Sequence, residues 1–185
     1  MNHDDCVKRV RYQEEVDVGS KEGLNDTLRH LAHRYTAIAE QILGDRLTTI
    51  ALYGSVARGE ARATSDIDLF IVLRDPPLGA FKRRLLLQLV RDDLIHELEQ
   101  LWQQRVYTDF VEVIRSEAEA QLFHPLYLDM TTEAHLLYDR DGFLATILQR
   151  VRERLNTLGA QRRKLGTIVY WDLKPGLMPG EVIKL

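Results

Sequence analysis

The sequence has almost no cysteine: Cys6 is the single one among 185 residues. One cysteine cannot form an internal disulfide, and no cluster of cysteines exists that could hold a structural metal. This composition is typical of a reducing compartment, so we expect a cytoplasmic protein. Residues 1–5 are polar and acidic and lack the apolar segment of a signal peptide.

Long apolar runs and an excess of positive charge are also missing. The longest apolar runs, such as Leu69–Leu73, are too short to span a bilayer, so no membrane partner is expected. The formal net charge is -3, which excludes a generally basic nucleic-acid binder and argues against a nucleic-acid polymer as direct substrate. A chain of this length can bury a core as one domain.

Hydrophobic periodicity predicts alternating helices and strands. Helices are expected over Leu24–Leu43, Ala80–Gln103, Ser116–Leu122 and Asp141–Leu158, and strands over Leu47–Tyr53, Ile67–Leu73, Val106–Ile114 and Thr167–Leu173. Leu126–Tyr138 fits either type. This order predicts an α/β or α+β domain with helices packed on a small sheet.

The ends and faces of these helices can also be predicted. Asn25 or Asp26 could cap the first helix and Asp141 the last, with Gly44 and Gly159 at their C-termini. In the long middle helix, the residues expected to face inward are Phe81, Leu85, Leu89, Leu94, Leu98 and Leu101.

A possible phosphate-binding turn follows the first predicted strand. Gly54 ends that strand, and glycine allows the backbone to approach a ligand closely. If Ser55–Arg58 begins a short helix, its free N–H groups can bind phosphate. The hydroxyl of Ser55 would add a further donor.

Two aspartates open the next predicted strand. Asp66 and Asp68 are two residues apart, so their carboxylates would share one face, with Cα atoms about 6–7 Å apart. Such neighbours repel unless a cation lies between them, and oxygen ligands favour Mg²⁺. A Gly-Ser turn alone, or an Asp-x-Asp pair alone, is common in proteins without a catalytic role. Together, at the start of a strongly apolar strand, they require an explanation.

The spacing of these residues resembles that of a known superfamily. Gly54-Ser55, then ten residues, then Asp66-Ile67-Asp68 is similar to the signature of DNA polymerase beta-like nucleotidyltransferases. Ala57-Arg58-Gly59 and Ser65 resemble the minimal nucleotidyltransferase branch. The resemblance covers about a tenth of the chain.

The resemblance implies a fold and a domain organisation. The fold is a mixed sheet flanked by helices, here with a C-terminal helical extension. We therefore expect a nucleotidyltransferase core over residues 24–121 and an extension over 122–185 packed on the same domain. The polar composition of residues 1–23 indicates a flexible lead-in before the core. The implied reaction transfers a nucleoside monophosphate from a nucleoside triphosphate, usually ATP, and releases pyrophosphate.

The resemblance also assigns roles to residues. Asp66 and Asp68 would hold Mg²⁺, in two ions that bridge the attacking and leaving oxygens. Nucleotide binding would fall to Gly54, Ser55, Arg58 and Ser65, although Arg58 could instead form an ion pair that steadies the turn.

A third carboxylate is expected on the strand after the long helix. Asp109 is the preferred candidate, as a metal ligand and as the base that accepts the proton of the acceptor hydroxyl. Glu112 is the rival. On a regular strand positions 109 and 112 face opposite ways, so both cannot reach one metal site.

The acceptor of the nucleotide remains open between three alternatives. Minimal nucleotidyltransferases are often paired with HEPN-type toxins, which they silence by attaching AMP to a tyrosine, and the small size favours this antitoxin role. A small, aminoglycoside-like acceptor would require an acidic pocket. A catalytically decayed module would act by binding its partner alone.

Two C-terminal clusters are candidates for further sites. Arg162-Arg163-Lys164 could attract phosphate or an acidic partner, but a solvated loop is the favoured interpretation. Tyr170-Trp171 could stack on a base, but a place in the core is favoured.

Overall fold

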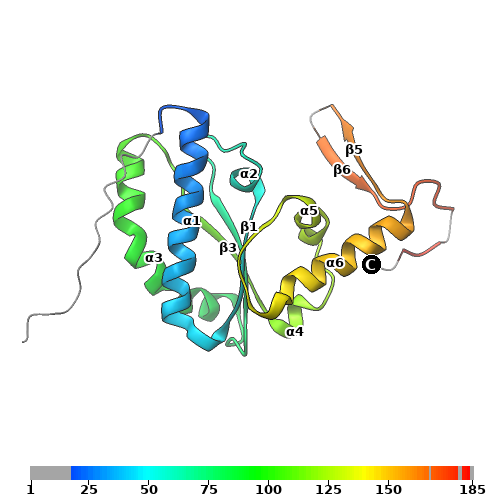
Figure 1. Cartoon of the computed structure of the whole chain (residues 1–185), viewed down its shortest axis with the longest axis horizontal. Helices are drawn as coiled ribbons and strands as arrows, with labels where there is room; N and C mark the ends of the chain where they lie inside the picture. Colours follow the sequence, from blue (N-terminus) through cyan, green and yellow to red (C-terminus); the bar gives the residue numbers. More distant parts are fainter. Residues whose placement is uncertain (1–17, 167, 179–180, 184–185) are drawn as a thin grey trace, which may run out of the picture.

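A four-stranded mixed sheet forms the centre of the molecule (Figure 1). The computed structural model describes residues 18–166, 168–178 and 181–183, so residues 1–17 of the predicted lead-in lie outside the described part. The strands are β1 (Leu47–Tyr53), β2 (Ile67–Leu73), β3 (Phe110–Ser116) and β4 (His135–Asp139), in the order β3-β2-β1-β4. Since β2 and β3 are parallel and the other pairs antiparallel, the predicted mixed sheet is confirmed.

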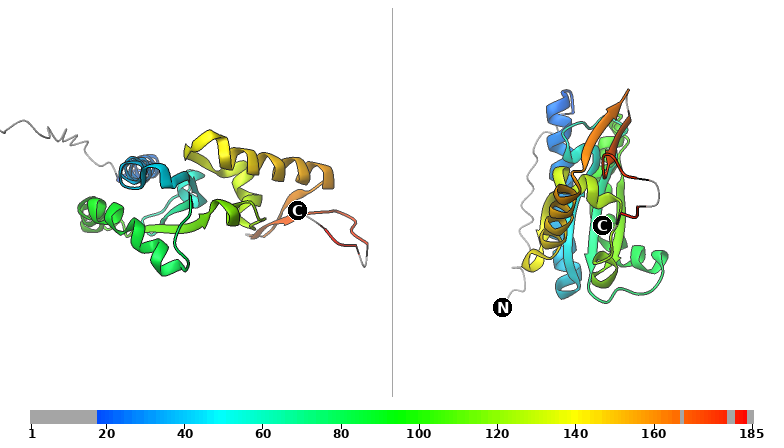
Figure 2. Two further views of the ribbon diagram at one scale, coloured as in Figure 1. Left: turned by 90° about the horizontal axis from the view of Figure 1, so that it is seen from below. Right: turned by 90° about the vertical axis from the view of Figure 1, so that its right-hand side faces the viewer.

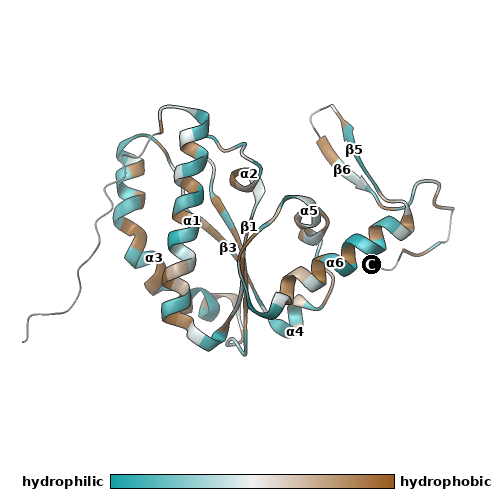
Figure 3. Ribbon diagram, viewed as in Figure 1, coloured by the Kyte–Doolittle hydropathy of each residue, from teal (hydrophilic) through white to brown (hydrophobic). Residues whose placement is uncertain are grey.

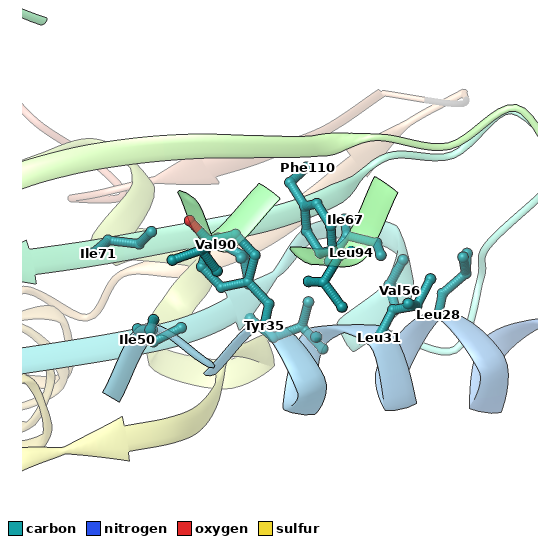
Figure 4. Close-up of a cluster of buried hydrophobic side chains, with 14 of the residues drawn as sticks. Leu28, Leu31, Tyr35, Ile50, Val56, Ile67, Ile71, Val90, Leu94 and Phe110 are labelled. Atoms are coloured by element: carbon teal, nitrogen blue, oxygen red, sulfur yellow. The ribbon is translucent and has the colours of Figure 1, made fainter. Parts of the chain in front are cut away.

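Helices α1 (Lys21–Leu43) and α3 (Ala80–Gln103) cover one face of the sheet. Figure 4 shows how Tyr35 of α1 lies among the buried side chains of Ile50, Val90 and Phe110. Tyr35 also donates a hydrogen bond to the Glu112 carboxylate at 2.9 Å. Aliphatic side chains fill most of this layer, so apolar burial dominates its stability.

The opposite face is covered by α4 (Glu117–Ala120), α5 (Leu126–Glu133) and α6 (Phe143–Leu158) (Figure 2). Phe70 of β2 meets Tyr127 of α5 edge to face, with ring centroids 5.5 Å apart. Because both sheet faces are covered, β2 is apolar throughout except at Asp68. Among the described residues, no helix is long and apolar enough to cross a membrane.

The predicted helix caps are partly wrong. Ser20 caps α1 by accepting a hydrogen bond from the Gly23 N–H, whereas Asn25 is buried within the helix and accepts from the Ala61 N–H. The last residues of the predicted lead-in therefore belong to α1. Asp139, not Asp141, accepts from the first free N–H groups of α6. The C-terminal glycines Gly44 and Gly159 are confirmed.

The inward face of α3 also differs from the prediction at its N-terminal half. Phe81, Leu85 and Leu89 are exposed, with 79%, 60% and 61% of their surface accessible. The buried stripe consists of Arg83, Leu87, Val90, Leu94, Leu98 and Leu101. Two apolar series with the same helical spacing run along α3, so periodicity alone could not choose between them.

The C-terminal part of the chain contains strands as well as helices. The ambiguous segment Leu126–Tyr138 divides into α5 and the edge strand β4, so the sheet continues past residue 121. After α6, β5 (Gln161–Leu165) and β6 (Ile168–Asp172) form an antiparallel hairpin. The predicted strand Thr167–Leu173 corresponds to β6, whereas β5 was not predicted. The 3-10 turns Gly44–Arg46 (η1) and Arg140–Gly142 (η2) precede β1 and α6.

Arg83 provides a test of how the two helical layers are joined at the sheet edge. Its buried guanidinium donates to Glu119 at 2.9 Å and to the Pro77 carbonyl at 3.0 Å, and it lowers the pKa of Glu119 to about 2. We expect Arg83→Ala to lower the free energy of unfolding by about 2–3 kcal/mol, because these acceptors lose their donor. Denaturant unfolding measures the change.

The matched control is Arg84→Ala, since Arg84 is exposed and makes no ion pair with another described residue. We expect this variant to stay within about 0.5 kcal/mol of the wild type. Equal losses in both variants would contradict the structural role of Arg83.

Candidate active site

The turn after β1 is built on a glycine for two separate reasons. Gly54 has φ +74°, a backbone conformation that side chains disfavour. A Cβ atom at this position would also lie 2.2 Å from Oδ2 of Asp68. The structure therefore shows a close approach at Gly54 to the carboxylate of the second aspartate, whereas the close approach predicted from the sequence was to a ligand.

Directly after this turn begins α2 (Gly54–Ala57), as the sequence predicts. The first N–H groups of a helix have no partner within it, so this helix start offers free donors beside Asp68. Arg29 of α1 holds the other end, donating to the carbonyls of Val56 and Ala57 at 3.2 and 3.0 Å. Sequence reasoning missed Arg29 because this contact joins positions far apart in the chain.

Asp66 and Asp68 lie where β2 begins. Asp68 is half-buried and opposes Tyr53 of β1, whereas Asp66 is exposed and precedes the strand. Burial, and then the charge of Asp66, raise the pKa of Asp68, while Arg58 acts in the opposite direction. The two carboxylates thus repel each other, which is the electrostatic situation that a bound cation relieves.

Asp109 contacts the aspartate pair through its backbone and not through its side chain. Its N–H donates to Oδ1 of Asp66 at 3.2 Å, but both carboxylate oxygens accept from Arg91 of α3 at 2.9 Å. Within the described residues, no three acidic, histidine or cysteine side chains are grouped to hold a metal. The expected cluster of three carboxylates is therefore not assembled, because the Arg91 guanidinium holds the third.

Glu112, the rival third acid, faces away from the two aspartates. Its register neighbour on β2 is Leu69, whereas Asp68 lies beside Val111, so the two carboxylates occupy opposite sheet faces. Glu112 is buried against Tyr35 and Arg91, and this burial raises its pKa. Arg91 contacts both Asp109 and Glu112. Asp109 precedes β3, so the alternation that would place positions 109 and 112 on opposite faces of a regular strand does not apply to Asp109.

The other two predicted nucleotide-binding residues, Arg58 and Ser65, stabilise the loop between α2 and β2. Arg58 pairs with Glu60 at 2.8 Å and with Glu133 of α5 at 2.9 Å, which is the ion-pair alternative considered for it. The Ser65 hydroxyl accepts from the Arg62 N–H at 3.0 Å. Both side chains line a cavity of about 1340 Å³.

The C-terminal hairpin borders the same cavity. Arg162, Arg163 and Lys164 line it from β5, so the expected loop is a strand, whereas the expected solvent exposure of this cluster is confirmed. The favoured core location of Tyr170-Trp171 is also wrong: Tyr170 is 44% exposed, and the indole N–H of Trp171 donates to Asp129 of α5 at 2.9 Å.

Comparison with known proteins shows the family of this chain. A family model described as a nucleotidyltransferase domain matches residues 37–136. The chain belongs to this nucleotidyltransferase family. A protein of Methanocaldococcus jannaschii, named as a protein adenylyltransferase, is 29% identical over 125 residues, which are 68% of this chain and 81% of that protein.

Solved structures give more distant likenesses. A toxin–antitoxin structure with AMP-PNP matches with a TM-score of 0.42 and 17% identity, over 69% of this chain and 92% of the other. A structure of tri-AMPylated Shewanella oneidensis HEPN toxin with an MNT antitoxin matches with a TM-score of 0.40 and 15% identity. The match covers 71% of this chain and 92% of the other chain. Both likenesses are too distant to bear on function.

The family assignment confirms the resemblance read from the motif. The range matched by the family contains Gly54, Ser55, Asp66 and Asp68 and reaches into β4. The protein is therefore a nucleotidyltransferase. The β5–β6 hairpin lies outside the matched range.

The fit of Gly54 against Asp68 can be tested with a matched pair of glycine variants. Gly54→Ala and Gly59→Ala both place a side chain at positive φ, of +74° and +71°, which costs about 1–2 kcal/mol. At Gly59 the nearest atom to the new Cβ is 3.6 Å away, at Gly54 only 2.2 Å. We expect a clearly larger loss of thermal stability for Gly54→Ala; equal melting temperatures would refute the close fit.

Proposed function

We propose that this nucleotidyltransferase transfers AMP from ATP to a hydroxyl group of a partner protein, in a reaction that depends on Mg²⁺. One observation carries the proposal: the side-chain-free turn at Gly54 brings the free N–H groups of α2 directly beside the Asp68 carboxylate. This proximity supports the proposal, because nucleotidyl transfer requires donors for phosphate and oxygen ligands for a metal side by side.

The residues have distinct tasks in this reaction. The acceptor hydroxyl oxygen attacks the α-phosphorus and releases its proton to water, the bond to the bridging oxygen of the β-phosphate breaks, and pyrophosphate leaves. The α2 N–H groups and the Ser55 hydroxyl bind the phosphates. Asp66 and Asp68 would hold Mg²⁺, proposed as two ions, and the metal would supply positive charge against the phosphate oxygens. Asp109 fixes Asp66 through its backbone N–H.

A protein acceptor is supported by the curated relative, which is named as a protein adenylyltransferase. The resemblance to minimal nucleotidyltransferases makes a HEPN-type toxin the proposed partner, and an antitoxin role in the cytoplasm the proposed biological setting. The charge of the cavity argues against a cationic, aminoglycoside-like acceptor, because basic side chains outnumber acidic ones in its wall.

A second candidate function follows from the pairing of Asp109 with Arg91. With the third carboxylate held by a guanidinium, the chain would act as a binding module that silences its partner by forming a complex. The two functions differ in whether the aspartates are needed.

Calorimetric titration of ATP, with and without Mg²⁺, separates these candidates. We expect the wild type to bind ATP with Mg²⁺, and Asp66→Ala/Asp68→Ala to bind at least roughly tenfold more weakly, because it lacks the oxygen ligands of the metal. Asp92→Ala/Asp93→Ala is the matched control, since it removes two exposed carboxylates from α3 and should bind like the wild type.

Circular dichroism should show that both double variants keep the fold. If the wild type binds no ATP with Mg²⁺, or if the Asp66→Ala/Asp68→Ala variant binds it unchanged, the enzymatic proposal is wrong. A variant that still silences the partner protein would then support the binding module.

A further inference from the structure

The cavity beside the active-site turn has walls from distant parts of the chain. Ser55 and Ser65 belong to the motif, Lys21 to the first turn of α1, and Glu133 to α5. The last wall is β5 of the hairpin, which follows α6 (Figure 1). The C-terminal hairpin and the nucleotidyltransferase motif thus line one open cavity.

This cavity is strongly basic, unlike the chain as a whole. Six basic side chains and three acidic ones line it, whereas the whole chain carries a net charge of -3. The basic residues are Lys21, Arg58, Arg62, Arg162, Arg163 and Lys164. The charge distribution therefore predicts an anionic occupant.

Ion pairs hold the hairpin in place over the turn. Glu133, whose side chain is only 9% exposed, pairs with Arg58 of the motif and with Arg162 of β5. The Trp171 indole anchors β6 to Asp129 of α5. The position of β5 relative to the motif is thus fixed by contacts on both strands of the hairpin.

Three of the cations have no such partner. Lys21, Arg62 and Lys164 form no ion pair with any residue in the described part of the chain, although they come from three separate segments. The acidic side chains of the cavity, in contrast, are already engaged with Arg58, Arg162 and Trp171. All three side chains are exposed at the wall of the cavity, so their charges are available to a bound anion.

We propose that this cavity binds the polyphosphate of the nucleoside triphosphate, with Lys21, Arg62 and Lys164 facing its outer phosphates. The inference rests on the proposed function, because the cavity shares Ser55 with the phosphate-binding turn. The hydrophilic strand β5 (Figure 3) lies outside the residues that match the family, so it extends the nucleotide site beyond the family domain. These residues would also hold the departing pyrophosphate.

Titration with inorganic tripolyphosphate in the absence of metal tests the cavity directly. We expect the wild type to bind it, and Arg62→Ala/Lys164→Ala to bind both it and ATP at least roughly tenfold more weakly, because two charged contacts are lost. AMP, which lacks the outer phosphates, should bind equally to both proteins.

The matched control is Arg46→Ala/Lys82→Ala. It removes the same charge from exposed side chains that line no part of the cavity and make no ion pair within the described residues. We expect wild-type affinity for tripolyphosphate in this variant. Equal affinities in the two double variants would overturn the proposal, because the loss would then reflect net charge alone.

Two other results would also overturn it: no binding of tripolyphosphate by the wild type, or tighter, Lys164-dependent binding of a single-stranded RNA oligonucleotide. The last result would assign the cavity to nucleic acid. Failure of the proposed function looks different. In that case tripolyphosphate binding still depends on Arg62 and Lys164, but ATP with Mg²⁺ binds without requiring Asp66 and Asp68.

Discussion

The contact between Gly54 and Asp68 links the fold of this protein to its chemistry. β1 and β2 pair so that Tyr53 opposes Asp68, and the chain leaves β1 at the next residue. Only a residue without a side chain can turn there, because the Asp68 carboxylate fills the space that a Cβ would need. The same geometry places the free N–H groups of α2 beside a half-buried carboxylate, which is the basis of the proposed phosphate and metal site.

The surrounding elements keep that contact in place. Arg29 holds the end of α2, the backbone of Asp109 holds Asp66, and Arg58 links the loop to Glu133 of α5. Glu133 in turn pairs with Arg162, so the appended hairpin is joined to the motif through one buried carboxylate. The family domain and the C-terminal hairpin therefore line one cavity.

Much of the fold and the centre of the site could be predicted, because they depend on local patterns. The bounds of β1, β2 and α3, and the turn at Gly54, followed from apolar periodicity and residue type. The sequence did not reveal the partners of Asp109 or the position of β5. Asp109 is held by Arg91, and Arg162 by Glu133, across long separations that no local pattern records. The face of α3 was mispredicted because Leu85 and Leu87 belong to two equally regular apolar series.

Gly54, Asp66 and Asp68 are proposed to form one site for nucleotide and metal. A crystal structure with Mg²⁺ and a non-hydrolysable ATP analogue would show whether they do. We expect Mg²⁺ bound by the carboxylates of Asp66 and Asp68, with the phosphates on the α2 N–H groups and directed toward Lys164. A nucleotide bound elsewhere, or bound here without contact to either aspartate, would contradict this proposal.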